Sequence, residues 1–194
     1  MATITISTNS SLDGVVQDPD GTEGFDRGGW FPPPGSLERV AWAEHGEAEA
    51  HAAGALLLGR STYEWFASRW ANRDGAWADR LNGLQKFVVS SQLDAADATW
   101  GPTTALRGDV AEQVARLKEE QEGELVVYAS YRLGQLLLEH DLVDEVRVFV
   151  FPVVLGAGRR LFGETSARKP LRLRKATTVG GGLALLTYEA ATSA

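Results

Sequence analysis

Hydroxyl and arginine side chains follow three predicted strands, in turns where a ligand with negative charge can be bound. The turns are Gly59-Arg60-Ser61-Thr62, Ser90-Ser91-Gln92 and Ala129-Ser130-Tyr131-Arg132. A helix N-terminus presents unpaired amides and a partial positive charge, and arginine is a two-pronged donor to phosphate oxygens. Each turn taken alone is more often ordinary helix capping. The three together indicate one extended ligand that carries several phosphates, such as a dinucleotide.

Other patterns that carry chemistry are weak or absent. The chain has no cysteine, which excludes disulfides, thiolate zinc sites and cysteine nucleophiles. His45 and Glu49 are four residues apart, as a metal-binding pair on a helix would be, but no third ligand is in view. We therefore interpret both as exposed helix residues and predict no metal site. The run 156–161 lacks the third glycine of a dinucleotide fingerprint and favours a plain glycine-rich turn.

Short apolar or alternating runs predict the strands that position these turns. The predicted strands cover residues 2–7, 55–58, 87–89, 103–106, 125–128 and 146–151, with a final hairpin of 171–179 and 183–188 around Gly180-Gly181-Gly182. Cap patterns predict three helix starts: Ser36 before a helix over 37–53, a capping box of Ser61 with Glu64, and Asp109 with Glu112.

This alternation of strands and helices predicts a single α/β domain over residues 1–194. The central sheet would be mostly parallel, with helices on both faces and the C-terminal hairpin antiparallel at one edge. In such sheets ligands bind beyond the carboxyl ends of the strands, where loops lead into helices. The three turns are therefore expected along one edge of the sheet.

A long irregular stretch, from about Asn9 to Gly35, is rich in Gly, Asp and Pro. Loops of this length in compact domains are often lids or binding loops, and the alternative is a solvated excursion. Trp30 and Phe31 argue against disorder. Trp30, Trp42 and Trp65 are expected either to wall a flat heterocycle or to pack in the core.

The composition limits the kinds of binding partner and the cellular compartment that we expect for this chain. The chain has 194 residues, with 19 Lys+Arg against 26 Asp+Glu, so its net charge is −7. An acidic chain has no electrostatic reason to bind nucleic acid or an anionic membrane. The longest apolar candidate, 146–155, falls short of the ~20 residues of a membrane helix, and no secretory signal is apparent. We expect a cytoplasmic protein.

The sequence resembles the dihydrofolate-reductase-like fold, in particular the reductase domain of RibD C-terminal type, including its stand-alone bacterial relatives. The resemblance runs from about residue 3 to residue 188. It is carried by Ser11-Leu12-Asp13-Gly14-Val15-Val16, by the runs 56–64 and 86–91, by Leu106-Arg107-Gly108-Asp109-Val110, by Leu142-Val143-Asp144-Glu145 and by the run 151–162. The resemblance implies a three-layer sandwich and a homodimer.

It also implies an NADPH-dependent reductase of a flat nitrogen heterocycle, similar to 5-amino-6-(5-phosphoribosylamino)uracil or to a pterin, with a place in riboflavin biosynthesis. The alternative is a non-catalytic domain that binds a nucleotide or another small ligand on the same fold. By resemblance, the cofactor residues are Gly59, Arg60, Ser61, Thr62, Ser90, Ser91, Ala129, Ser130, Tyr131 and Leu133. The residues that border the nicotinamide and substrate are Asn9, Leu12, Asp13, Val16 and Trp30.

Two departures from the family pattern stand out. Ala129 and Tyr131 occupy positions where the family usually has glycines close to the cofactor pyrophosphate. Dihydrofolate reductases carry a carboxylate on the first helix that assists protonation of the substrate. Here we take Glu44 and Glu47 as the catalytic candidates, with Glu49 nearby, and no spacing selects one of them.

Overall fold

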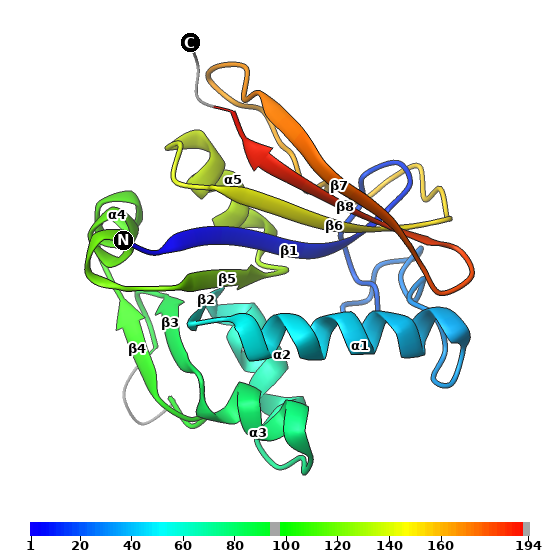
Figure 1. Cartoon of the computed structure of the whole chain (residues 1–194), viewed down its shortest axis with the longest axis horizontal. Helices are drawn as coiled ribbons and strands as arrows, with labels where there is room; N and C mark the ends of the chain where they lie inside the picture. Colours follow the sequence, from blue (N-terminus) through cyan, green and yellow to red (C-terminus); the bar gives the residue numbers. More distant parts are fainter. Residues whose placement is uncertain (94–97, 192–194) are drawn as a thin grey trace.

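The computed structural model describes residues 1–93 and 98–191, which form one eight-stranded sheet between two layers of helices (Figure 1). The strands are β1 (Thr3–Ser11), β2 (Ala55–Gly59), β3 (Gln85–Val89), β4 (Thr103–Leu106), β5 (Glu124–Tyr128), β6 (Glu145–Phe151), β7 (Leu171–Val179) and β8 (Leu183–Ala190). The helices are α1 (Leu37–Ala52), α2 (Arg60–Trp70), α3 (Ala76–Gly83), α4 (Val110–Glu120) and α5 (Tyr131–Glu139).

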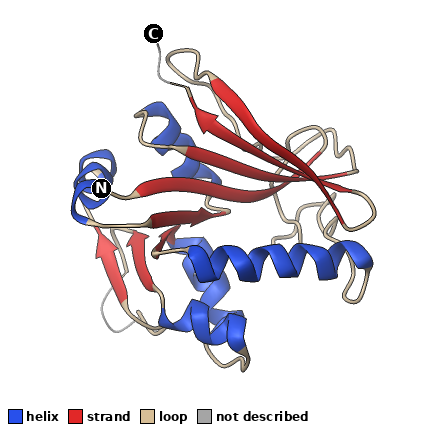
Figure 2. Ribbon diagram, viewed as in Figure 1, coloured by secondary structure: helices blue, strands red, loops and turns tan. Residues whose placement is uncertain are grey.

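The sheet has the strand order β4-β3-β2-β5-β1-β6-β8-β7. The first six strands in this order are parallel, and the β7–β8 hairpin adds two antiparallel strands beside β6 (Figure 2). This confirms the predicted mostly parallel α/β sheet with an antiparallel C-terminal hairpin. Strand β6 is paired on both sides, with β1 and with β8, so the C-terminal hairpin covers it within the chain.

Each face of the sheet has its own apolar core. On one face, Val114 of α4 and Leu137 of α5 pack against Ile4, Ile6 and neighbouring strand residues. On the other face, residues of α1, α2 and α3 pack against Leu56, Leu58 and Val88. Strands that are buried on both faces read as continuous apolar runs, which is why β2, β3 and β5 were visible in the sequence.

A third apolar cluster joins the loop before α1 to strands β6 and β8. Trp30 contacts Phe151 edge-to-face at a ring distance of 5.4 Å, and Phe31 contacts Trp42 at 4.9 Å. Trp65 lies apart on α2, where its Nε1 donates a hydrogen bond of 2.8 Å to Asp20 Oδ2. The three tryptophans therefore do not form one wall.

Helix starts follow the sequence in two cases and depart from it in one. Ser36 Oγ accepts from Arg39 N in α1, and Asp109 Oδ1 accepts from Glu112 N in α4, as predicted. The capping box of Ser61 with Glu64 is wrong. Helix α2 begins already at Arg60, so Ser61 lies inside the first turn and Glu64 pairs with Arg60 instead.

The loop between β1 and α1 is ordered around a buried aspartate, and β1 continues to Ser11, further than predicted. Asp18 is fully buried, and its carboxylate accepts hydrogen bonds from Glu23 N (2.9 Å) and Phe25 N (3.0 Å). A Cβ atom on Gly28 would lie 2.4 Å from Asp18 Oδ2, so only glycine allows this approach. The loop therefore has a defined structure held by Asp18 and is not a solvated excursion.

Among the described residues, none of the helices combines the length and the apolar character that crossing a membrane requires. Within the same residues there is no group of three or more His, Cys, Asp or Glu placed to hold a metal ion.

Candidate functional site

The carboxyl ends of the parallel strands bring the three predicted turns to one edge of the sheet. Strands β2 and β5 are neighbours, and the loops that follow them touch, because Gly59 N donates a hydrogen bond of 3.0 Å to Ser130 Oγ. Strand β3 lies on the other side of β2 and ends at Val89, one residue before Ser90. The first and third turns are thus in direct contact, and the second is adjacent.

Two helices that begin at this edge leave their first amides without a side-chain cap. Gly59, at the N-cap of α2, has no side chain to offer, and the Ser130 hydroxyl at the N-cap of α5 is bound to Gly59 N instead. Helices α1 and α4 are capped by side chains. Open amides at a helix N-terminus bind anions, and here two such termini lie side by side.

The first and second turns are linked by Arg60. Its Nε donates to Glu64 Oε1 at 2.7 Å, and its Nη1 donates to Gln92 Oε1 at 2.8 Å. Ser90 Oγ accepts from Gln92 N (3.1 Å) and Leu93 N (3.0 Å), which shapes the second turn. Ser61 and Ser91 are exposed and Thr62 is half-buried. Arg60 therefore ties the turn after β3 to the start of α2, where Ser61 and Thr62 lie.

The third turn has a strained backbone. Ala129 and Ser130 both adopt left-handed conformations, with φ values of 48° and 38°. Each such residue costs on the order of 1–3 kcal/mol, and glycine at position 129 would avoid the cost. Tyr131 is the first residue of α5 and is half-buried, whereas Leu133 points into the core, so a role for its side chain at the cofactor stays a prediction.

Asp13 binds backbone amides of the loop that follows β6. Its carboxylate accepts from Leu155 N (3.0 Å), Gly156 N (2.8 Å) and Ser11 Oγ (2.7 Å). These hydrogen bonds, that from Leu155 N first among them, hold the pKa of Asp13 at about 2, below its usual range. Asp13 therefore joins the loop 12–16 to the glycine-rich loop 156–161, a structural role that the sequence did not reveal.

The other predicted loop residues are spread over the same end of the molecule. Asn9 Oδ1 accepts a hydrogen bond of 2.9 Å from Trp42 Nε1, and Trp30 Nε1 donates one of 2.9 Å to the carbonyl of Gln17. Leu12 is exposed, and Val16 packs against the core on the α4–α5 face.

The carboxylates of α1 point in different directions. Glu44 is exposed, and Glu47 lies 3.9 Å from His51 Nε2 near the surface. Glu49 is nine-tenths buried and contacts Arg147 at 3.0 Å, and His45 is half-buried. The expectation that both are exposed helix residues is therefore wrong. Burial raises the pKa of Glu49, although the Arg147 guanidinium acts in the opposite direction.

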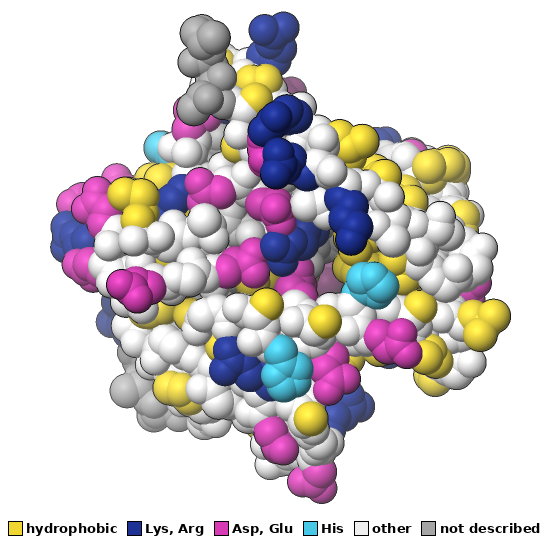
Figure 3. Space-filling view, viewed as in Figure 1, with side chains coloured by type: hydrophobic (Ala, Val, Ile, Leu, Met, Phe, Trp, Pro, Cys, Tyr) yellow, Lys and Arg dark blue, Asp and Glu magenta, His cyan; other side chains and the backbone are white. Residues whose placement is uncertain are grey.

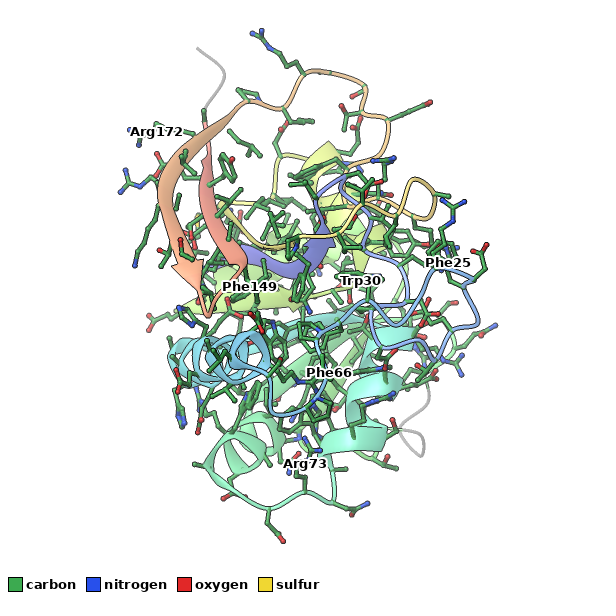
Figure 4. All side chains as sticks on the ribbon, turned by 90° about the vertical axis from the view of Figure 1, so that its right-hand side faces the viewer. Phe25, Trp30, Phe66, Arg73, Phe149 and Arg172 are labelled. Atoms are coloured by element: carbon green, nitrogen blue, oxygen red, sulfur yellow. The ribbon has the colours of Figure 1, made fainter. Side chains whose placement is uncertain are left out.

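A fourth carboxylate, which sequence reasoning missed, faces a cavity at the end of β6. The cavity, of about 260 Å³, is lined by Trp30, Pro32, Glu38, Phe151, Pro152, Val153, Gly182 and Leu183. Glu38 is the ionisable side chain of this set and lies in the first turn of α1. Trp30, from the loop before α1, packs edge-to-face on Phe151, and Figure 4 shows it to the right of the β7–β8 hairpin.

A second hollow, of about 180 Å³ and lined by more ionisable side chains, lies further along α1, where His45 and Glu49 face Arg147, Phe149, Lys175, Leu185 and Thr187. Figure 3 shows charged side chains gathered in the hollow between the hairpin and α1. Arg147 there is bound by three carboxylates, those of Glu49, Glu124 and Glu145.

Comparison with known proteins places this geometry in a family. The family model described as the RibD C-terminal domain matches residues 2–185. The chain belongs to the RibD C-terminal domain family. A curated relative, the uncharacterized protein YyaP of Bacillus subtilis, is 29% identical over 138 residues, which are 69% of this chain and 72% of YyaP.

Solved structures show the same fold at low sequence identity. A putative riboflavin biosynthesis protein from Shewanella sp. PV-4 matches with a TM-score of 0.73 and 23% identity, over 98% of this chain and 99% of that one. RibD of Acinetobacter baumannii matches with a TM-score of 0.67 and 15% identity, over 98% of this chain and 58% of that one. The RibD C-terminal domain is a reductase domain, so membership is consistent with an oxidoreductase.

Proposed function

We propose that this RibD C-terminal domain is an NADPH-dependent reductase of a flat nitrogen heterocycle. The observation that carries the proposal is the junction of two uncapped helix N-termini, α2 and α5, joined by the hydrogen bond from Gly59 N to Ser130 Oγ. Two adjacent sets of open amides suit a ligand with phosphates at more than one position. A dinucleotide is such a ligand.

The side chains around this junction fit NADPH. Arg60, Ser61 and Thr62 at the start of α2, with Ser90 and Ser91 beside them, would hold the adenosine phosphates. Ser130 and the first amides of α5 would hold the pyrophosphate. When bound, NADPH supplies the hydride, and the protein supplies binding, orientation and exclusion of water.

The substrate would occupy the cavity at the end of β6, between Trp30 and Phe151. An aromatic lining with a few polar groups suits a flat ring of the uracil or pterin type. Glu38 faces this cavity, so we take it as the first candidate to hold a ring N–H or deliver a proton. Glu44 and Glu47, which the sequence put forward, lie toward the surface and serve as matched comparisons.

Two measurements test the proposal. First, NADPH should raise the melting temperature of the protein. At one hundred times its dissociation constant, a ligand adds ~2.7 kcal/mol of stability. For a domain of this size that corresponds to about 5–10 °C. No shift with millimolar NADPH, in protein shown to be folded, contradicts cofactor binding.

Second, turnover should be followed as NADPH oxidation with 5-amino-6-(5-phosphoribosylamino)uracil and, separately, with dihydrofolate. Glu38→Gln should lower kcat/KM, whereas Glu44→Gln and Glu47→Gln should leave it unchanged. Ala129 adopts a positive φ at a position where the resemblance implies glycine. This departure favours one alternative, a domain that binds its ligand without turnover. NADPH binding without oxidation by either compound supports that alternative.

The proposal includes a homodimer, as the family resemblance implies. Strand β6 is covered within the chain by β8, so it does not provide the contact surface. The open edge of the sheet on this side is β7.

A further inference from the structure

Tyr131, at the start of α5, is flanked by two arginine side chains. The guanidinium carbons of Arg132 and Arg159 each lie 5.7 Å from the centre of the Tyr131 ring. Arg132 Nε also donates a hydrogen bond of 2.9 Å to Tyr131 Oη. The ring and the two guanidinium groups therefore form one cluster at the start of α5.

Arg159 reaches Tyr131 from a loop that is fixed to its neighbours. Its backbone N–H donates to Gln17 Oε1 at 3.0 Å, and its carbonyl accepts from Val16 N at 2.9 Å. The anchor of Arg159 is therefore the loop 12–17, which borders the proposed nicotinamide position. The arginine links that loop to the start of α5.

The ionic partner of Arg159 is weak. Its Nη1 lies 3.8 Å from Glu23 Oε2, and both side chains are about half exposed, at 49% and 52%. Exposed ion pairs of this kind contribute little, so exchanging Glu23 for a bound phosphate costs little. The Tyr131 ring meanwhile keeps the guanidinium near the helix start through a cation–π contact.

We propose that Arg159, positioned by Tyr131, binds the diphosphate of the nicotinamide dinucleotide, an inference that rests on the proposed function. The open amides of α5 and the Arg159 guanidinium would then contact the same group from two sides. In this view Tyr131 does not close the site, because its ring holds the Arg159 guanidinium beside the start of α5.

The diphosphate is common to NADPH and NADH, whereas the ribose phosphate belongs to NADPH alone. Arg159→Gln should therefore weaken both nucleotides by the same factor, about tenfold to a hundredfold, measured by titration calorimetry on the full chain. Arg159→Lys, which keeps the charge, should recover part of the affinity. Arg168→Gln removes the same charge from an exposed position in the 162–168 loop and should leave both affinities unchanged.

Tyr131 is tested by two further variants. Tyr131→Phe keeps the ring and should bind both nucleotides almost as the wild type does, whereas Tyr131→Ala should weaken both. Unchanged binding by Arg159→Gln, loss for NADPH alone, or tighter binding by Tyr131→Ala would each overturn the inference while NADPH binding itself stands. Wild-type protein that binds neither nucleotide overturns the proposed function and this inference together.

Discussion

At the scale of single residues, the hydrogen bonds of Arg60 constrain its role. It lies at the start of α2, as a phosphate ligand should, but it already bonds to Glu64 and Gln92. To bind the ribose phosphate of NADPH, Arg60 must therefore exchange these hydrogen-bond partners for the phosphate oxygens. A charge-assisted hydrogen bond is worth ~1.5–3 kcal/mol, so Arg60→Ala should weaken NADPH by about tenfold, the lower end of that range, and leave NADH unchanged. Titration calorimetry with both nucleotides checks this, and equal losses would exclude the assigned role.

Lys86 is a second residue with a measurable consequence. It is fully buried, its Nζ donates to Asn82 O at 2.8 Å, and it lies 4.5 Å from the Trp100 ring centre. Burial lowers its pKa to about 8 from an ordinary value of 10.5. Between these two values the unfolded chain binds more protons than the folded chain, so stability rises with pH across the window.

The pH dependence of Lys86 can be isolated with a variant. Wild-type protein should gain stability relative to Lys86→Met as the pH rises from 8 to about 9.5, below the range where unfolded tyrosines titrate. Urea midpoints at several pH values measure the difference. Lys175→Met, at an exposed position of β7, is the control and should show a constant difference from the wild type. A constant difference for Lys86→Met would contradict the lowered pKa.

At the scale of elements, the sequence predicted what local patterns determine. Periodicity revealed strands such as β2 and β5, and cap residues placed the starts of α1 and α4. Helix α3 was missed because it is short and begins after Gly75 without a side-chain cap. The start of α2 was misplaced because two cap patterns overlap there, and the local sequence does not decide between Gly59 and Ser61.

In the candidate site, too, some features could be predicted from the sequence and others could not. The meeting of the three turns was predictable because parallel strands end at one edge of a sheet. The position of Glu38 at a cavity was not predictable, because the cavity is completed by β6 and the β7–β8 hairpin, which come much later in the chain. The buried Asp18 was missed for a related reason, since its partners form only when the whole loop closes.

The loop around Asp18 carries its own prediction. Gly28→Ala would place a Cβ atom 2.4 Å from Asp18 Oδ2, so the loop must shift and release the carboxylate from its amides. We expect a loss of stability of roughly 1–3 kcal/mol and faster limited proteolysis between β1 and α1. Gly83→Ala is the control, because a Cβ atom there meets nothing within 4 Å. Equal behaviour of the two variants would show that the loop does not depend on Asp18.

At the scale of the whole molecule, the proposed homodimer requires a contact surface. Edge strands invite pairing with other chains unless charges guard them. Strand β7 carries Arg172, Arg174 and Lys175, all exposed, so positive charges on this edge strand oppose its pairing with another chain. We therefore expect a homodimer that does not pair through the β7 edge of the sheet. Light scattering should give a mass near twice 20.9 kDa, and Leu173→Glu on β7 should leave that mass unchanged. A concentration-independent mass near 20.9 kDa would refute the dimer, and conversion to monomer by Leu173→Glu would place the contact at β7 after all.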